Sequence, residues 1–187
     1  GFTTQPTLIL LGGGHVNKAL YNLATTLSFR TYIIDDRREF SNKKRFPEAA
    51  ETIVADFDKG LDKIDINANT FILVATRGHR YDDIALEGAM NTPARYIGLL
   101  GSKRKSIMIY KRLIKDGHTT DKLEEIRAPV GLNIGAITPE ELAVSIMAEI
   151  IMIRRGGDGA PLKMDSKQLK NITKQQGKQW EALQPSS

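Results

Sequence analysis

A run of glycines ahead of a histidine is the first segment whose residue types and spacing indicate a binding chemistry. The segment comprises Gly12, Gly13, Gly14 and His15. It follows a short apolar run as a G-x-G pattern, in which Gly12 permits a tight turn and Gly14 lets the backbone approach a pyrophosphate at a helix start. Asn17 stands where a third glycine is usual. The pattern favours nucleotide binding, and a plain strand-to-helix turn is the alternative.

Two acids and two arginines follow the second apolar run. Asp35 lies 21 residues past Gly14 (35 minus 14), a distance at which a carboxylate accepts from a ribose 2′-hydroxyl in dinucleotide-binding folds. Asp36 could take that role, whereas Arg37 and Arg38 could hold a 2′-phosphate. Because a carboxylate about 4 Å from a phosphate costs about 4 kcal/mol at a surface-like dielectric, the acids favour a ribose without that phosphate. The alternative is a solvated turn whose charges pair with one another.

A third turn follows the most apolar run of the chain. It contains Thr76, Arg77, Gly78 and His79, with Asp82 close behind. An arginine and a histidine beside a flexible glycine could clamp a phosphate or polarise a carbonyl. The alternative is local, because His79 and Asp82 could cap the following helix. The clustering of polar types at one strand end favours a binding role.

A fourth turn is strongly basic. It comprises Gly101, Ser102, Lys103, Arg104 and Lys105. Ser102 is placed to cap the next helix, so three cations fall in its first turn. Each is unfavourable there by about 0.3–1 kcal/mol because the helix dipole is positive at that end. A bound anion would reverse this effect, so the turn predicts an anion site, with a solvated basic turn as the alternative.

Apolar runs alternate with helical periodicities along most of the chain. The predicted strands are residues 7–11, 32–34, 52–55, 71–75 and 96–99. The predicted helices are residues 16–27, 80–90, 103–116 and 139–154. This alternation predicts an α/β fold of three layers, Rossmann-like, with a mostly parallel sheet and helices on both faces. Ligands of such sheets bind beyond the carboxyl ends of the strands, where all four turns are expected to meet.

The last predicted helix is apolar on nearly all sides, which is typical of a helix buried in a core or in an oligomer interface. A homodimer is therefore one expectation. The helix also carries Glu141, Ser145 and Glu149 in one polar stripe, and Glu149 is expected to pair with a buried arginine or to line the site. We expect residues 1–156 to form the Rossmann-like domain and residues 157–187 a polar, loosely ordered tail.

Composition excludes several classes of protein. The chain has 187 residues, a net charge of +5 and no cysteine, so it holds no disulfide, thiolate zinc site, iron–sulfur cluster or cysteine nucleophile. Its three histidines are widely separated, and no metal site built by protein ligands alone is expected. With 6% aromatic residues, no secretory signal and no long apolar segment, we expect a cytoplasmic protein that binds neither nucleic acid nor membrane.

The motifs occur in a defined order. They are Gly12-x-Gly14-His15-Val16, Asp35-Asp36-Arg37-x-x-Phe40, Arg45-Phe46-Pro47, Thr76-Arg77-Gly78-His79-x-x-Asp82, Tyr96-Ile97-Gly98-x-x-Gly101-Ser102-x-x-Lys105, Pro129-x-Gly131-Leu132-x-Ile134-Gly135-Ala136 and Pro139-Glu140-Glu141-x-Ala143-x-Ser145-Ile146. Over about residues 7 to 156 they resemble the nucleotide-binding C-terminal domain of the XdhC/CoxI family. The resemblance implies a non-catalytic accessory protein that binds the molybdenum cofactor and delivers it to the apoenzyme of a molybdenum hydroxylase such as xanthine dehydrogenase.

If the chain has this role, the residues of the four turns are expected to hold the cofactor, molybdopterin in its mono- or dinucleotide form. They are Gly12, Gly13, Gly14, His15, Asp35, Asp36, Arg37, Thr76, Arg77, Gly78, His79, Gly101, Ser102, Lys103, Arg104 and Lys105. Members of the family protect a sulfurated cofactor, and a chain without cysteine needs a partner such as a cysteine desulfurase to supply that sulfur. The alternative is an NAD(P)-dependent oxidoreductase that uses the same glycine loop, with His79 as acid or base, although no Tyr-x-x-x-Lys pair accompanies it.

Overall fold

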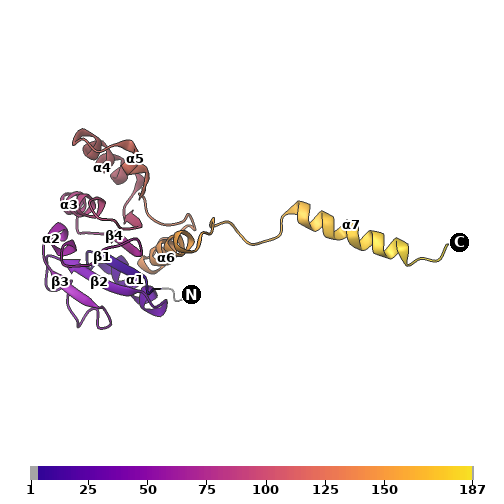
Figure 1. The fold of residues 1–187 in the computed structure, drawn as a ribbon, viewed down its shortest axis with the longest axis horizontal. Coiled ribbons are helices and arrows are strands. Elements are labelled where there is room, and N and C mark those ends of the chain that lie inside the picture. Colours follow the sequence, from indigo (N-terminus) through magenta and orange to yellow (C-terminus); the bar gives the residue numbers. More distant parts are fainter. Residues whose placement is uncertain (1–3, 187) are drawn as a thin grey trace. The chain divides into compact units, whose positions relative to one another are not determined.

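The computed structural model describes residues 4–186 and divides into two units (Figure 1). The first unit runs to Gly157 and contains the whole sheet, whereas the second begins at Asp158 and contains one helix. No helix within residues 4–186 combines the length and the apolar content needed to cross a bilayer.

A six-stranded sheet organises the first unit. Its strands are β1 (Thr7–Leu11), β2 (Arg30–Asp35), β3 (Glu51–Val54), β4 (Thr70–Val74), β5 (Tyr96–Leu99) and β6 (Ile126–Arg127). They lie in the order β3-β2-β1-β4-β5-β6, and every neighbouring pair is parallel. The predicted α/β class is confirmed, with a sheet that is parallel throughout.

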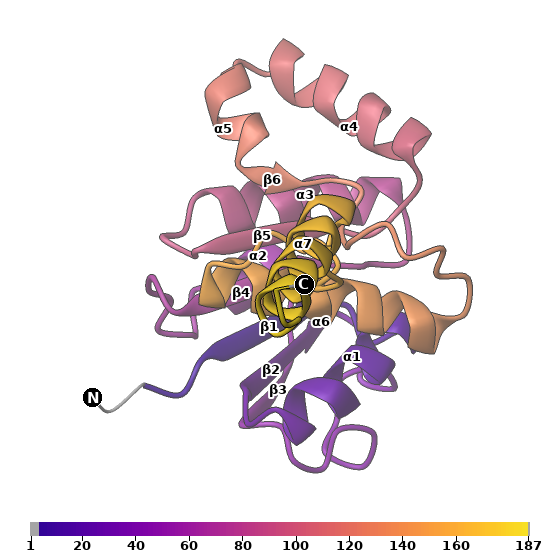
Figure 2. The same ribbon diagram turned by 90° about the vertical axis from the view of Figure 1, so that its right-hand side faces the viewer.

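Helices cover both faces of this sheet (Figures 1 and 2). The helices are α1 (His15–Thr26), α2 (Phe57–Leu61), α3 (His79–Met90), α4 (Lys103–Lys115), α5 (Thr120–Glu124) and α6 (Pro139–Arg155). Alternate strand residues enter two separate cores, as period-2 side-chain alternation requires. Leu8 and Leu10 pack with α1 and α6, whereas Ile9 and Leu11 pack with α2, α3 and α4. The three-layer arrangement is therefore as predicted.

Three short elements were not predicted from the sequence, namely α2, α5 and β6. Each spans five residues or fewer, which is too short for a hydrophobic period to be recognised. The longer α6 begins as its sequence predicts, because Thr138 and Glu141 form a reciprocal capping box and Pro139 occupies the first turn.

The second unit contains α7 (Ser166–Ala182). The sequence predicts a polar, loosely ordered tail here and no helix. Asp165 caps the helix by accepting from the backbone amide of Gln168, and the Gln168 side chain accepts from the amide of Asp165. This capping box is a local sequence signal for the start of a helix. No residue of α7 is buried.

Candidate functional site

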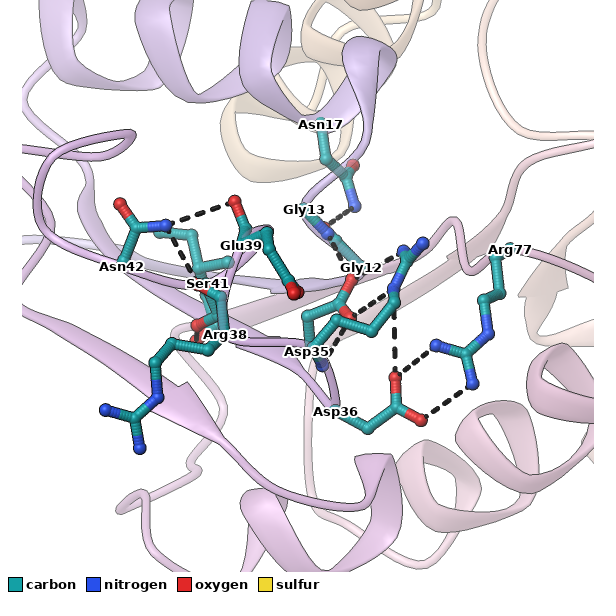
Figure 3. A network of polar contacts seen from close by, with 12 residues as sticks. Gly12, Gly13, Asn17, Asp35, Asp36, Arg38, Glu39, Ser41, Asn42 and Arg77 are labelled. Carbon is teal, nitrogen blue, oxygen red and sulfur yellow. Dashed lines mark hydrogen bonds and ion pairs between the residues drawn. The ribbon is translucent and has the colours of Figure 1, made fainter.

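The four polar turns meet at the carboxyl edge of the sheet. In the parallel register, Leu11 pairs with both Ile34 and Val74, so β1, β2 and β4 end at the same level. Gly12 follows β1 directly, Asp35 is the last residue of β2, and Thr76 lies two residues past the end of β4. Figure 3 shows the first two turns side by side. The structure therefore brings together the residues that the sequence placed at this edge.

Gly12 and Gly13 are glycines because neighbouring backbone leaves no room for a side chain. A Cβ atom on Gly12 would lie 2.1 Å from the carbonyl oxygen of Ala75, and one on Gly13 would lie 1.8 Å from that of Phe40. Gly14 differs, since a Cβ there would meet no atom within 4 Å. Of these three glycines, Gly14 alone has the open space that a ligand needs for close approach.

Asp35 does not present the free carboxylate that its position predicts. Its side chain is fully buried and accepts hydrogen bonds from the amide of Gly13 (3.0 Å) and from both the amide and the guanidinium of Arg37 (3.0–3.1 Å). Burial alone would raise the pKa of Asp35, but the hydrogen bonds from Arg37 and Gly13 outweigh it and lower the pKa. Through these hydrogen bonds the carboxylate holds the glycine loop against β2 (Figure 3).

Asp36 and Arg37 of the acid–arginine turn also have partners within the protein, whereas Arg38 is exposed. Asp36 accepts two hydrogen bonds from Arg77, at 2.8 and 3.0 Å, across 41 residues of sequence. Arg77 lies over the ring of Tyr81 at 4.1 Å, and Arg37 lies over the ring of Phe40 at 3.7 Å. Asp36, Arg37 and Arg77 thus have partners within the protein, as in the internally paired alternative, and their predicted role in holding the cofactor stays a prediction.

Lys105, which is expected to bind an anion, has partners within the protein, and its role as an anion ligand stays a prediction. Its ammonium group forms an ion pair with the fully buried Asp82 and donates to the carbonyl of Leu100 at 3.2 Å. The other oxygen of Asp82 accepts from the amide and the hydroxyl of Thr76, at 3.0 and 2.6 Å. Asp82 thus ties the turn after β4 to the turn after β5.

The polar stripe on α6 has a structural role. Glu149 is 5% exposed and accepts from the hydroxyl of Tyr96 at 2.9 Å and from the amide of Gly131 at 3.2 Å. Burial and the nearby carboxylate raise the pKa of Tyr96. The expected partner of Glu149, a buried arginine, is replaced by a tyrosine and a backbone amide, which fix the loop after β6 against α6.

The open part of the edge surrounds the start of α1. Gly14 is the N-cap residue, no side chain caps the helix, and no acid lies in its first turn. The first amides of a helix have no intrahelical partner, so they carry partial positive charge towards this opening. The buried amide of Asn17 donates to the carbonyl of Gly12 at 2.8 Å. A side chain at the third-glycine position thus fastens the loop to the helix.

Two cations beside this opening were not among the predicted site residues. Arg45 donates from Nε to the carbonyl of Gly13 at 2.8 Å, and the ammonium group of Lys18 donates to the carbonyl of Arg45. Within residues 4–186, no carboxylate lies within ion-pair distance of either side chain. Burial and the neighbouring Arg45 lower the pKa of Lys18.

A groove of about 340 Å³ adjoins the same opening. It runs between α1 and the start of α6 and is lined by His15, Lys18, Leu23, Glu140 and Val144 among others. Its size lies at the lower end of small-molecule sites. The sequence signal for Arg45 was present in its Arg-Phe-Pro motif, whereas nothing in a single sequence places Lys18 beside it.

The other predicted residues remain open to solvent. His79, Ser102, Lys103 and Arg104 are exposed, and Ser102 caps α4 by accepting from the amide of Lys105 at 3.1 Å, as expected. No group of three or more histidine, aspartate or glutamate residues within residues 4–186 is arranged to hold a metal ion.

Comparison with known proteins identifies the domain. A profile of the XdhC Rossmann domain matches residues 8–150. This chain belongs to that family. It is 35% identical over 156 residues to YqeB of Escherichia coli (strain K12), covering 83% of this chain and 28% of that protein. It is also 35% identical over 151 residues to a probable xanthine dehydrogenase subunit of Bacillus subtilis (strain 168), covering 81% of this chain and 44% of the relative.

A chaperone and a solved structure extend these similarities. The molybdenum cofactor insertion chaperone PaoD of Escherichia coli is 24% identical over 154 residues, covering 82% of this chain and 42% of PaoD. The crystal structure of a xanthine dehydrogenase from Bacillus halodurans superposes with a TM-score of 0.72 at 33% identity, covering 85% of this chain and 45% of that one. The chain of this XdhC domain spans less than half the length of each of these relatives.

Proposed function

We propose that this XdhC domain is an accessory protein that binds the molybdenum cofactor as cargo and assists its insertion into a molybdenum hydroxylase such as xanthine dehydrogenase. The observation that carries the proposal is the opening at Gly14, where the uncapped start of α1 meets the uncompensated cations Lys18 and Arg45. An anion placed there would be favoured by the helix dipole and by both side chains. The phosphate or nucleotide end of molybdopterin has the matching charge.

The names of the relatives support the molybdenum cofactor as the ligand of this proposed anion site. One relative is named as a molybdenum cofactor insertion chaperone and another as part of a probable xanthine dehydrogenase. The groove beside the opening would receive the organic part of the cargo next to His15. Because the chain has no cysteine, the sulfur of a sulfurated cofactor would come from a separate protein, such as a cysteine desulfurase.

The alternative, an NAD(P)-dependent oxidoreductase, has less support from the geometry. Dinucleotide binding of that kind uses the acid after β2 as an acceptor for the ribose, and here Asp35 already bonds to Gly13 and Arg37. The backbone of Phe40 also closes the loop at Gly13. A hydride-transfer role would require this network to open.

Calorimetric titration and thermal unfolding test the proposal together. The ligands are molybdenum cofactor released from a molybdenum enzyme, cytidine diphosphate and NAD. We expect the cofactor to bind, and at 100 times its Kd to stabilise the fold by about 2.7 kcal/mol. Stabilisation by NAD alone, with none by the cofactor, would contradict the proposal and favour the oxidoreductase.

Matched variants locate the site. Lys18→Met and Arg45→Met each remove one cation at the opening, and each should weaken cofactor binding about tenfold through loss of one charge-assisted hydrogen bond. Lys63→Met removes an exposed cation outside the four turns and should leave the affinity unchanged. Equal affinity of all three variants would place the cargo elsewhere, and Lys103→Met with Arg104→Met then tests the basic turn.

A further inference from the structure

The helix α4 carries exposed apolar side chains and lysines together on its outer side. We call this surface the α4 face and define it by Ile107, Met108, Lys111, Ile114 and Lys115. At 3.6 residues per turn, these five positions span an arc of about 120°, with both lysines between the isoleucines and the methionine. Ile109 and Leu113 lie on the opposite side of the helix and pack into the core.

The apolar residues of the α4 face are about half exposed. The exposed fractions of Ile107, Met108 and Ile114 are 46%, 54% and 51%. The helix lies at the periphery of the first unit (Figures 1 and 2), and no part of that unit covers these side chains further. Exposed apolar residues scattered singly are ordinary, whereas a group of them on one surface marks an interaction site. Methionine in such a group adapts to varied partner surfaces.

The cations of α4 differ according to the side of the helix on which they lie. Lys105 and Arg112, at the borders of the buried side, form ion pairs with aspartates of α3. Lys111 and Lys115 form no ion pair within residues 4–186, and α4 contains no acid of its own. The α4 face thus carries positive charge that the first unit does not neutralise.

The helix α4 starts at the edge of the sheet that holds the proposed cargo site. It begins after β5, and α1 begins after β1, both at the carboxyl edge. Only β4 lies between these two strands, so their ends are about 10 Å apart at about 4.8 Å per strand. A protein that contacts α4 therefore reaches the edge from which the cargo would leave.

We propose that the α4 face docks onto an acidic protein surface that has apolar patches. This inference rests on the proposed function, under which that protein is the hydroxylase that receives the cargo. The lysines lie on the face that makes the contact, so they pair with carboxylates of the partner. The isoleucines and the methionine around them bury apolar area, which is the usual composition of a protein interface. Complementary charge also accelerates the encounter of the two proteins.

The arrangement of the α4 face disfavours other occupants. A helix that lies in a lipid interface has an apolar centre bordered by cations, whereas here the lysines lie between the apolar side chains. A nucleic acid would place phosphates against Ile107 and Ile114. The one aromatic residue of α4, Tyr110, donates its hydroxyl to the carbonyl of Ile126 at 3.3 Å and is not free to stack on a base. A second α4 is repelled by like charge, and so is α7, which has four lysines and one glutamate.

Charge reversal on the α4 face tests the docking. The full chain is titrated with a molybdenum hydroxylase freed of its cofactor, and binding is followed by biolayer interferometry. We expect Lys111→Glu with Lys115→Glu to weaken binding at least about tenfold. Lys63→Glu with Lys163→Glu makes the same change of charge at exposed positions outside α4 and should weaken binding about twofold or less. Added salt should slow the association of the unaltered chain more than that of the α4 variant.

Apolar substitutions separate direct contact from electrostatic attraction. Ile107→Ser with Ile114→Ser should speed dissociation about tenfold and leave the salt dependence of association unchanged, because loss of contact area acts mainly on dissociation. Leu27→Ser with Val54→Ser alters two apolar residues of similar exposure outside α4 and should leave dissociation unchanged. Thermal unfolding monitored by circular dichroism checks that each variant is folded.

Three results would overturn the inference. The first is unchanged affinity of both α4 variants for the hydroxylase. The second is binding to phosphatidylserine vesicles or to duplex DNA that the α4 variants lose while they keep the hydroxylase. The third concerns Trp180, the chain's only tryptophan, which lies in α7. A change in its emission caused by Ile107→Ser with Ile114→Ser in the free chain would identify α7 as the occupant of the α4 face.

Cofactor binding by the same variants distinguishes the two proposals. If the α4 face docks as inferred, Lys111→Glu with Lys115→Glu binds the cofactor like the unaltered chain and loses only the hydroxylase. Failure of the unaltered chain to bind the cofactor contradicts the proposed function. Intact cofactor binding by a charge-reversed variant that also keeps its full affinity for the hydroxylase contradicts the inference alone.

Discussion

The two halves of the carboxyl edge differ in how their charges are satisfied. On the side of β2 and β4, Asp35, Asp36 and Asp82 each pair with a cation. Around the start of α1, Lys18 and Arg45 lie beside an open turn with no carboxylate partner in residues 4–186. The first half is a network of ion pairs that fixes the loops, and the second is the opening at which we propose that an anion binds.

The two halves are therefore expected to have different roles. The paired residues hold the loops in place, and the unpaired cations are the proposed ligands of the cofactor's anionic end. Most charged residues predicted for binding belong to the network of ion pairs, because charged groups near a buried carboxylate stabilise the fold most by pairing with it. Substitutions around the start of α1 are therefore expected to lower ligand affinity and to leave stability nearly unchanged. Substitutions in the network of ion pairs are expected to lower the stability of the fold. The predictions below test that division.

The largest contrast is between adjacent glycines. Gly13→Ala places a methyl group 1.8 Å from the carbonyl oxygen of Phe40 and should destabilise the fold by about 3 kcal/mol or more. Gly14→Ala enters open space at a φ of −73° and should change stability by less than about 1 kcal/mol, while weakening cofactor binding. Urea unfolding and calorimetric titration measure the two effects. Equal losses of stability would remove the distinction.

Asp35→Asn should destabilise the fold by about 2 kcal/mol at pH 7, because it weakens the charged hydrogen bonds to Gly13 and Arg37. The pKa of Asp35 is lowered in the folded protein, so its stabilisation is complete above the unfolded-state pKa of about 3.9 and is lost as pH falls through the folded-state value. Urea unfolding at pH 7 and pH 3 should therefore show a smaller pH dependence in the variant. An unchanged pH dependence would contradict the assignment.

Lys105 and Lys103 are neighbouring cations with opposite expected behaviour. Lys105→Met leaves the buried Asp82 without its ion-pair partner and should destabilise the fold by about 1.5 kcal/mol. Lys103 is exposed and forms no ion pair within residues 4–186, so Lys103→Met should leave the melting temperature unchanged. Thermal unfolding monitored by circular dichroism makes the comparison. A matching loss from both variants would show that the basic turn is structural throughout.

The smallest expected effect is on the open side. Lys18→Met should change stability by no more than about 0.5 kcal/mol, because the positive charge it removes is uncompensated and solvent screens what remains. Burial and the neighbouring Arg45 also lower the pKa of Lys18, because both disfavour its charged form. Denaturant unfolding with and without phosphate checks this, and phosphate should stabilise the unaltered chain more than the variant. A loss of about 2 kcal/mol, the scale of a broken buried interaction, would assign Lys18 to the network of ion pairs.

Local patterns predicted the elements well where they were long enough to show a period. Residues 7–11 and 96–99 form strands, and Thr138 with Glu141 starts α6, because apolar alternation and helix capping depend on neighbouring residues only. No such pattern predicts β6, because a strand of two residues is too short to show one. At Asp165 the capping box that starts α7 lies in a polar segment, where no apolar period accompanies it.

The sequence by itself determined that four polar turns would share one edge of a parallel sheet, since the alternation of strands and helices along the chain is a local pattern and places every strand-to-helix turn at the carboxyl edge. Only the tertiary structure decided which of those residues are free. Asp36 meets Arg77 across 41 residues, and Arg45 reaches Gly13 across 32. Pairing depends on distances that the packed fold sets, so the same residue types form a network of ion pairs on one side of the edge and leave two cations without a carboxylate partner, within residues 4–186, on the other.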